Sequence, residues 1–184
     1  GRKARKRAEL PTISLVGYTN AGKSTLFNAI CGSQVYAKDQ LFATLDTTLR
    51  SLNLPGYGDI VLADTVGFVR ELPHKLVEAF KATLEEATEA DLLLHVVDSS
   101  SDQVEDEIAA VNQVLESIGA TDIPVLIVMN KVDALTDCAP RVDRDQTQPD
   151  KPARVWLSAK HQAGMDLLLE AIAQTLEGNI WQGQ

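Results

Sequence analysis

The sequence predicts an α/β domain with a six-stranded, mostly parallel sheet, one antiparallel edge strand and helices on both faces. Two observations predict this fold. Short apolar segments of strand length alternate with amphipathic segments of about fifteen residues, which is typical of parallel strands joined by helices. Most of the apolar segments are continuous, as expected for strands that are buried on both faces. The length of 184 residues fits one domain.

The N-terminal half is predicted to contain a strand, a helix and a hairpin. Residues 12–17, with Ile13, Leu15 and Val16 before a glycine, indicate a short buried strand, and the helix 23–30 begins after a glycine-rich turn. Residues 33–47 have weak periodicity and are expected to form a loop. Residues 49–54 alternate like an edge strand, and a Pro-Gly turn leads into 59–64, so this pair is predicted to form a hairpin.

Helices and buried strands alternate in the C-terminal half. The segment 74–90 places its apolar residues on one helical face, and the helix 104–118 ends at the glycine that follows it. Residues 92–97 and 123–129 are almost continuously apolar and indicate buried strands. The remaining segments are a polar loop with three prolines, a last strand and a last helix, at 133–152, 155–157 and 164–177.

The net charge of −9 is unevenly distributed. Residues 1–9 carry five Arg or Lys and one Glu, so the rest of the chain is strongly acidic, which argues against broad electrostatic binding of nucleic acid. We interpret residues 1–10 as the basic remnant of a preceding helical linker, 11–178 as the domain and 179–184 as a tail, and expect a domain excised from a longer protein.

Several features favour a cytoplasmic protein, which we expect to be a monomer. No apolar run is long enough to span a membrane, and no signal-peptide pattern is present. Cys31 and Cys138 have no metal-ligand spacing and are interpreted as reduced thiols. A membrane is therefore not expected to be the main partner.

The segment Gly17–Ser24 matches the phosphate-loop pattern GxxxxGK[ST] and lies between a strand and a helix, as that motif requires. Its glycines let the backbone wrap a phosphate, and the N–H groups of the turn and helix start face the anion. Lys23 is expected to reach the β- and γ-phosphates and to act in catalysis, and the Ser24 hydroxyl to coordinate Mg²⁺. The predicted nucleotide-binding residues here are Gly17, Asn20, Ala21, Gly22, Lys23, Ser24 and Thr25.

A second motif, Asp64–Gly67, ends the next strand that is expected to be parallel. Asp64 is predicted to hold Mg²⁺ through a water molecule, and the Gly67 N–H to sense the γ-phosphate during catalysis. A DxxG sequence alone is weak evidence, because any strand can end in Asp. Its position one hairpin after the phosphate loop strengthens it.

The segment Asn130–Asp133 also follows a buried strand and indicates recognition of guanine. The Asp133 carboxylate can accept hydrogen bonds from guanine N1–H and N2–H₂, whereas adenine lacks this pair of donors and would leave the carboxylate unpaired. Asn130 is expected to orient the loop or to meet the purine edge, and the Lys131 stem to cover the ring. Ser158 and Ala159 follow the last strand, where the Ala159 N–H can donate to guanine O6.

These four motifs, each at the end of a strand, predict the G domain of a P-loop NTPase that binds GTP or GDP. ATP is disfavoured because Asp133 would lose its guanine partners. His95 lies inside an apolar strand and is expected to be a packed, hydrogen-bonded core residue rather than a base.

Four segments have sequences that resemble the HflX family of bacterial GTPases: Gly17–Asn28, Leu41–Asp46, Asp64–Val69 and Leu72–Leu84. The resemblance extends from about Arg2 to Gly178. It implies a Mg²⁺-dependent GTPase that binds the large ribosomal subunit through the full-length protein and splits or rescues stalled ribosomes under stress.

The resemblance also implies that Thr44 closes over Mg²⁺ in the GTP state and belongs to the catalytic set. The sequence Asp46-Thr-Thr departs from the Asp-Pro-Thr often found in the family, so Thr47 and Thr48 are alternatives.

Two positions bear on the rate of hydrolysis. Phe68 stands where many GTPases carry a Gln that places water, which predicts slow intrinsic turnover. Arg70 and His74 either assist hydrolysis or are solvated surface side chains. Asn20 either helps to bind K⁺ beside the phosphates, as the resemblance implies, or only stabilises its turn. The alternative function is a GTP/GDP-dependent binding module with negligible hydrolysis that acts on another RNA or membrane-associated partner.

Overall fold

The computed structural model describes residues 10–32, 48–65 and 75–182. The predictions for Thr44, Thr47, Gly67 and Phe68 lie outside these residues, as do those for Arg70 and His74.

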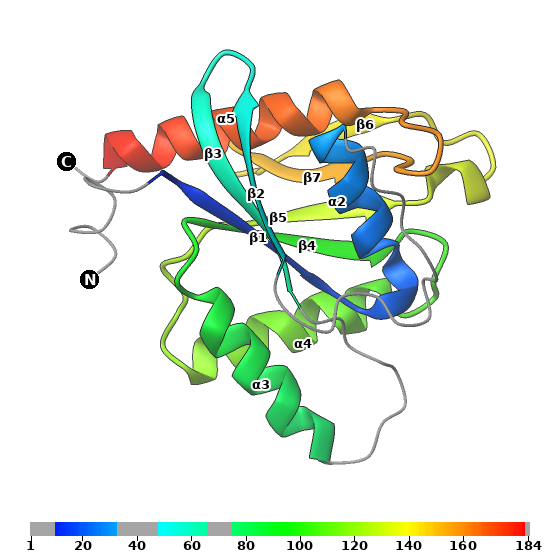
Figure 1. Ribbon diagram of the computed structural model, residues 1–184. Coiled ribbons are helices and arrows are strands. Elements are labelled where there is room, and N and C mark those ends of the chain that lie inside the picture. The colour runs from blue at the N-terminus through cyan, green and yellow to red at the C-terminus, as the bar shows by residue number, and fades with distance from the viewer. Residues whose placement is uncertain (1–9, 33–47, 66–74, 183–184) are drawn as a thin grey trace.

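The described residues form one seven-stranded sheet with the strand order β2-β3-β1-β4-β5-β7-β6 (Figure 1). Its inner strands pair in parallel, whereas β2 pairs antiparallel with β3 and β6 antiparallel with β7. The strands are β1 (Thr12–Gly17), β2 (Thr48–Leu54), β3 (Gly58–Asp64), β4 (Leu92–Asp98), β5 (Val125–Asn130), β6 (Arg141–Arg144) and β7 (Pro152–Trp156).

The α/β fold class is confirmed, and the sheet contains one strand more than the six predicted. The seventh strand, β6, lies in the segment 133–152 that was expected to be a loop, so the sheet has two antiparallel edge strands rather than one. The sequence Arg-Val-Asp-Arg has no apolar run, because an edge strand of four residues buries little of its surface. Its pairing with β7 becomes visible only in the folded chain.

Helices cover both faces of the sheet (Figure 1). The helices α2 (Lys23–Cys31) and α5 (Met165–Gln182) lie on one face and contribute to the largest cluster of buried apolar residues. The opposite face is covered by α3 (Lys75–Ala87) and α4 (Val104–Ser117), which pack around Leu93 and Val16. Among the described helices, none is long and apolar enough to cross a membrane.

The last helix is longer than the predicted 164–177, because α5 continues to Gln182, within the segment expected to be a tail. Gly178 does not end the helix, since one glycine inside a helix costs only about 1 kcal/mol relative to alanine.

The parallel arrangement places the predicted motifs at one edge of the sheet. The carboxyl ends of β1, β3, β4, β5 and β7 meet there, which is where ligands bind in open α/β sheets. The fold thus gathers segments that are far apart in sequence.

Candidate nucleotide-binding site

The phosphate loop is a tight turn that requires glycine at two positions. A Cβ at Gly17 would lie 2.5 Å from the Val96 carbonyl oxygen, and a Cβ at Gly22 would lie 2.6 Å from Asn130 Nδ2. Gly22 has a φ of +84°, precedes the first residue of α2 and provides no side-chain cap. The N–H groups at the start of α2 therefore have no side-chain acceptor at the cap position and are suited to binding an anion.

Lys23 is the most deeply buried charged residue of the site. Its side chain is 1% exposed, and its ammonium group donates to Asp64 Oδ1 and to the Thr65 carbonyl oxygen. Burial lowers the pKa of Lys23, and the neighbouring Asp64 offsets this only in part. A buried ammonium group of this kind is stabilised by any further anion, and a nucleotide phosphate at the start of α2 is such an anion.

Ser24 and Asp64 bring hard oxygen ligands together beside Lys23. Ser24 Oγ donates to Asp64 Oδ2 at 3.3 Å, and Thr65 Oγ1 donates to the Leu15 carbonyl oxygen at 2.6 Å, which anchors the end of β3 to β1. A hydroxyl and a carboxylate suit Mg²⁺. Within the described residues, no three His, Cys, Asp or Glu side chains form a cluster that could hold a metal ion.

Asn130 connects three loops of the site. Its Nδ2 donates to the Ala21 carbonyl oxygen at 2.8 Å, and its Oδ1 accepts the Ala159 N–H at 2.9 Å. The side chain is buried. Of the two roles that the sequence left open for Asn130, these contacts perform the orienting one. Because the Ala159 N–H already has an acceptor, a guanine O6 would have to share this donor.

Asp133 lies at the surface on the short helix η3 (Val132–Ala134), beyond the end of β5. A hydrogen bond from the Ser158 hydroxyl is the main reason that the pKa of Asp133 lies below its usual range, and nearby His161 and Lys160 also contribute. His161 Nε2 lies 3.6 Å from Asp133 Oδ2. The carboxylate is thus ionised near neutral pH and exposed to donors from a base.

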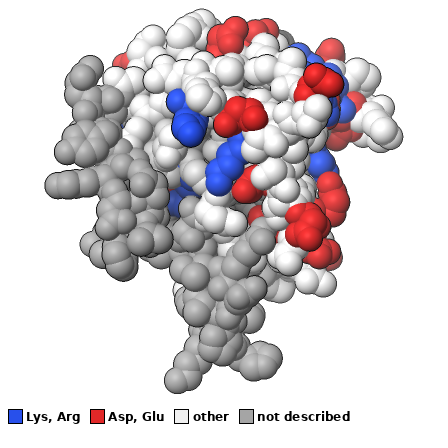
Figure 2. Space-filling model, turned by 90° about the vertical axis from the view of Figure 1, so that its right-hand side faces the viewer, with Lys and Arg blue, Asp and Glu red and all other residues white. Residues whose placement is uncertain are grey.

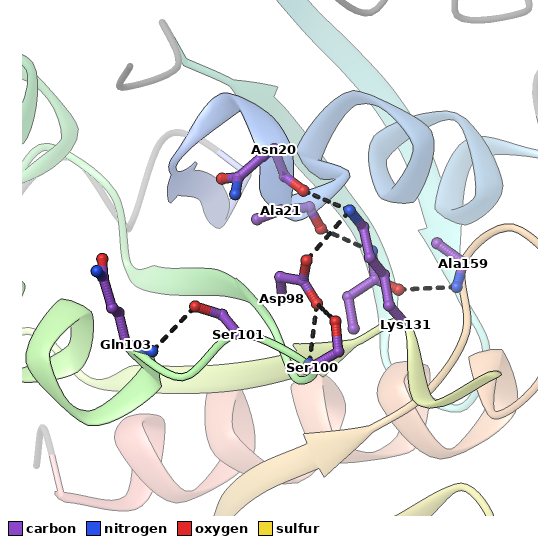
Figure 3. A network of polar contacts seen from close by, with 9 residues as sticks. Asn20, Ala21, Asp98, Ser100, Ser101, Gln103, Lys131 and Ala159 are labelled. Atoms are coloured by element: carbon purple, nitrogen blue, oxygen red, sulfur yellow. Dashed lines mark hydrogen bonds and ion pairs between the residues drawn. The ribbon is translucent and has the colours of Figure 1, made fainter. Parts of the chain in front are cut away.

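Lys131 reaches from the base-recognition segment to the phosphate loop (Figure 3). Its Nζ donates to the Asn20 carbonyl oxygen and lies 3.4 Å from Asp98 Oδ2. Asp98 is the last residue of β4, and its Oδ1 accepts the Ser100 N–H at 2.9 Å and the Ser100 Oγ–H at 2.6 Å. The sequence interpretation missed Asp98. The available signal was an acidic residue at the carboxyl end of a buried strand.

The remaining candidates occupy different positions. Thr25 is partly buried in the first turn of α2, and the Asn20 side chain is exposed. Thr48, an alternative for the Mg²⁺ threonine, is exposed at the start of β2 and lies opposite Asp64 in the antiparallel register. Thr44 and Gly67 lie outside the described residues.

His95 lies in the core, as predicted. It is 1% exposed, and burial lowers its pKa to about 4. The expected hydrogen bonding is incomplete, because Nε2 has no hydrogen-bond partner among the described residues.

The face that carries the strand ends has a mixed charge (Figure 2). Lys and Arg side chains near its centre are interspersed with Asp and Glu, which are also frequent on the right of the view, and the chain as a whole carries a net charge of −9. A local group of cations in an acidic protein suits one bound anion better than an extended polyanion.

Comparisons with known proteins agree with this site. Residues 12–131 match the model of a family described as 50S ribosome-binding GTPase. The GTPase HflX of Escherichia coli (strain K12) is 58% identical over 182 residues, which are 99% of this chain and 42% of that protein. The GTPase HflX of Caldanaerobacter subterraneus subsp. tengcongensis is 49% identical over 95% of this chain and 39% of its own length. The chain thus spans less than half of these relatives.

A solved structure shares the fold. The crystal structure of a GTP-binding protein from the archaeon Sulfolobus solfataricus, in complex with GDP, has a TM-score of 0.66 and 26% sequence identity. The similarity covers 96% of this chain and 56% of that one.

Proposed function

The chain belongs to the 50S ribosome-binding GTPase family, as a G domain of the HflX type, and from this premise we propose that it is a guanine-nucleotide-dependent switch. The observation that carries the proposal is the buried cluster of Lys23, Asp64 and Ser24 at the start of α2. It joins a cation for phosphate to hard oxygen ligands for Mg²⁺, while the exposed Asp133 carboxylate, beyond the end of β5, can accept the guanine edge.

In the proposed mechanism, the two ends of the nucleotide contact different strand ends. The phosphates lie against the N–H groups of Gly17–Ser24, and Lys23 exchanges its Asp64 partner for the β- and γ-phosphates. Asp133 accepts the guanine N1–H and N2–H₂. Asn130 fixes the distance between the two sites, because it bonds both Ala21 and Ala159.

We propose that Ser24, Asp64 and Thr44 hold Mg²⁺, with Thr47 and Thr48 as alternatives to Thr44. When bound there, Mg²⁺ would neutralise part of the negative charge of the nucleotide phosphates. The Gly67 N–H donates to the γ-phosphate. Because Phe68 cannot place a water molecule by hydrogen bonding, we expect slow intrinsic hydrolysis that rises when a partner completes the site.

The proposed partner is the large ribosomal subunit, which the full-length protein would bind in its GTP state and leave after hydrolysis, as part of ribosome splitting or rescue under stress. A ribosomal partner also places the protein in the cytoplasm. The test is GTP turnover by this chain with and without purified large subunits, with Lys23→Ala as the inactive control. We expect slow turnover that the subunits raise at least tenfold.

Turnover that the subunits leave unchanged would contradict the proposal that this domain itself receives the ribosomal signal. If, in addition, the chain binds GTP without measurable hydrolysis, the result would favour the alternative of a nucleotide-dependent binding module.

A second prediction concerns K⁺. The Asn20 side-chain amide makes no hydrogen bond to any described residue, so its oxygen is available to an ion beside the phosphates. We propose that K⁺ binds there and adds positive charge where phosphoryl transfer needs it. Turnover should then be faster in KCl than in NaCl of equal ionic strength, and Asn20→Ala should remove the difference. Equal rates in the two salts would contradict this proposal.

A further inference from the structure

Asp98 is a charged residue at the nucleotide edge to which no motif assigns a role. It ends β4 directly beside Asn130 of β5, and its side chain is only 17% exposed. The Ser100 N–H and hydroxyl both donate to Oδ1, at 2.9 and 2.6 Å, which fixes the carboxylate and directs Oδ2 toward Lys131 (Figure 3).

Lys131 has two anchors, and Asp98 is one of them. The ammonium group donates to the Asn20 carbonyl oxygen and lies 3.4 Å from Asp98 Oδ2, while the residue's backbone is left-handed, with a φ of +69°. A left-handed conformation is uncommon for a residue other than glycine, and such residues are enriched at functional sites. The two contacts of Nζ show that the lysine side chain spans from the base-recognition segment to the phosphate loop.

Asp98 is ionised, and the positive charge of Lys131 lies beside it. Burial raises the pKa of Asp98, but the hydrogen bonds from Ser100 and the charge of Lys131 outweigh this effect, so the pKa lies below its usual range. An ionised carboxylate beside a phosphate site repels the ligand unless a cation neutralises it. Asp98 and Lys131 thus act as a unit, in which the acid orders the lysine and the lysine neutralises the acid.

We propose that Asp98 is a positioning residue for guanine nucleotides, which holds Lys131 across the phosphate loop so that its stem is already in place when the base binds. This inference rests on the proposed binding of guanine nucleotides. Ordering the lysine in advance reduces the side-chain entropy that is lost on binding, and this reduction increases affinity.

The test is a double-mutant cycle on the affinity for GDP with Mg²⁺, measured by calorimetry. Asp98→Asn keeps the shape but removes the charge, and it should raise Kd about threefold to tenfold, in the range expected when one hydrogen bond of ordinary strength is lost. Lys131→Met should weaken binding more, and the double variant no further than Lys131→Met alone. Asp102→Asn, an exposed acid in the same loop, is the matched control and should leave Kd within twofold.

Two readouts separate positioning from a general structural effect. Asp98→Asn should raise KM for GTP and leave kcat unchanged, because the contact is equally strong in the ground state and the transition state. Ser100→Ala, at an exposed position, should raise Kd in the same direction by a smaller factor, even if Asp98→Asn folds poorly.

The inference is overturned if Asp98→Asn and Ser100→Ala bind GDP as tightly as Asp102→Asn, or if the effects of Asp98→Asn and Lys131→Met multiply. If instead the unsubstituted chain does not bind GDP, the proposed function fails, and this inference with it.

Discussion

Single residues at the strand ends combine burial with charge. Lys23 is a buried ammonium group that is paired with Asp64, whereas Asp133 is an exposed carboxylate whose pKa is lowered by the Ser158 hydroxyl. The first arrangement suits an anionic ligand, and the second suits a ligand that presents paired N–H donors. The sequence singled out both residues, because each lies in a motif with a defined spacing, and their roles stay predictions.

Contacts between residues that are distant in the sequence could not be predicted from the sequence alone. Lys131 was expected only to cover the base, but its ammonium group also contacts Asn20 and Asp98. These residues are separated by 111 and 33 positions along the chain. No local pattern encodes such a meeting, which depends on the order of the strands in the sheet.

His95 allows a prediction about stability and pH. Its pKa of about 4 in the folded chain lies below the value of about 6.5 expected when the chain is unfolded, so the unfolded state binds a proton first as pH falls. The free energy of unfolding is therefore unaffected by His95 above pH 6.5, and it declines from there toward pH 4.

Between pH 7.5 and pH 5.5, this decline should amount to about 1 kcal/mol, and His95→Leu should remove it. At pH 7.5 the leucine variant should be at least as stable as the unsubstituted chain, because the unpartnered Nε2 is gone. Urea denaturation at both pH values measures the difference, with the exposed His161→Gln as control. A stability difference between His95→Leu and the unsubstituted chain that is the same at both pH values would contradict this explanation.

At the scale of elements, the apolar strands and amphipathic helices were predictable, and the edge of the sheet was not. The strands β4 and β5 are almost continuously apolar, and β1 is a short buried strand that ends in glycine, so local sequence identifies all three. In contrast, β6 is held by its pairing with β7 and by Arg141, whose guanidinium group lies 4.1 Å from the centre of the Trp156 ring. Such partners are visible only in the folded chain.

The two glycines that flank α2 form a matched pair for a test of the phosphate loop. Gly22 and Gly32 both have left-handed φ values, +84° and +58°, but a Cβ at Gly22 meets Asn130 Nδ2 at 2.6 Å, and a Cβ at Gly32 meets nothing within 4 Å. Both alanine variants should lose roughly 1–2 kcal/mol of stability from backbone strain.

Only Gly22→Ala should also displace Asn130, and we expect it to weaken GDP binding more than about tenfold. Gly32→Ala should bind within about twofold of the unsubstituted chain. Denaturation and GDP titration of both variants provide the comparison. Equal binding by the two variants would mean that the contact between Asn130 and the phosphate loop is not needed.

In the molecule as a whole, the parallel sheet brings the residues of the site together. Each parallel crossover returns the chain to the same edge, so Gly17, Asp64, Asp98, Asn130 and Ser158 meet although they span most of the sequence. The described part of this edge carries mixed charge in a chain with a net charge of −9, and the buried Lys23 and the helix start suit one phosphate group.

Selection of guanine nucleotides by this edge of the sheet can be measured by calorimetric titration of the chain with GDP and with ADP in the presence of Mg²⁺. We predict one site per chain for GDP and an affinity for ADP at least about a hundredfold lower, because adenine leaves the Asp133 carboxylate without its paired donors. Equal affinity for the two nucleotides, or no binding of GDP, would mean that the strand ends do not form a guanine-specific site.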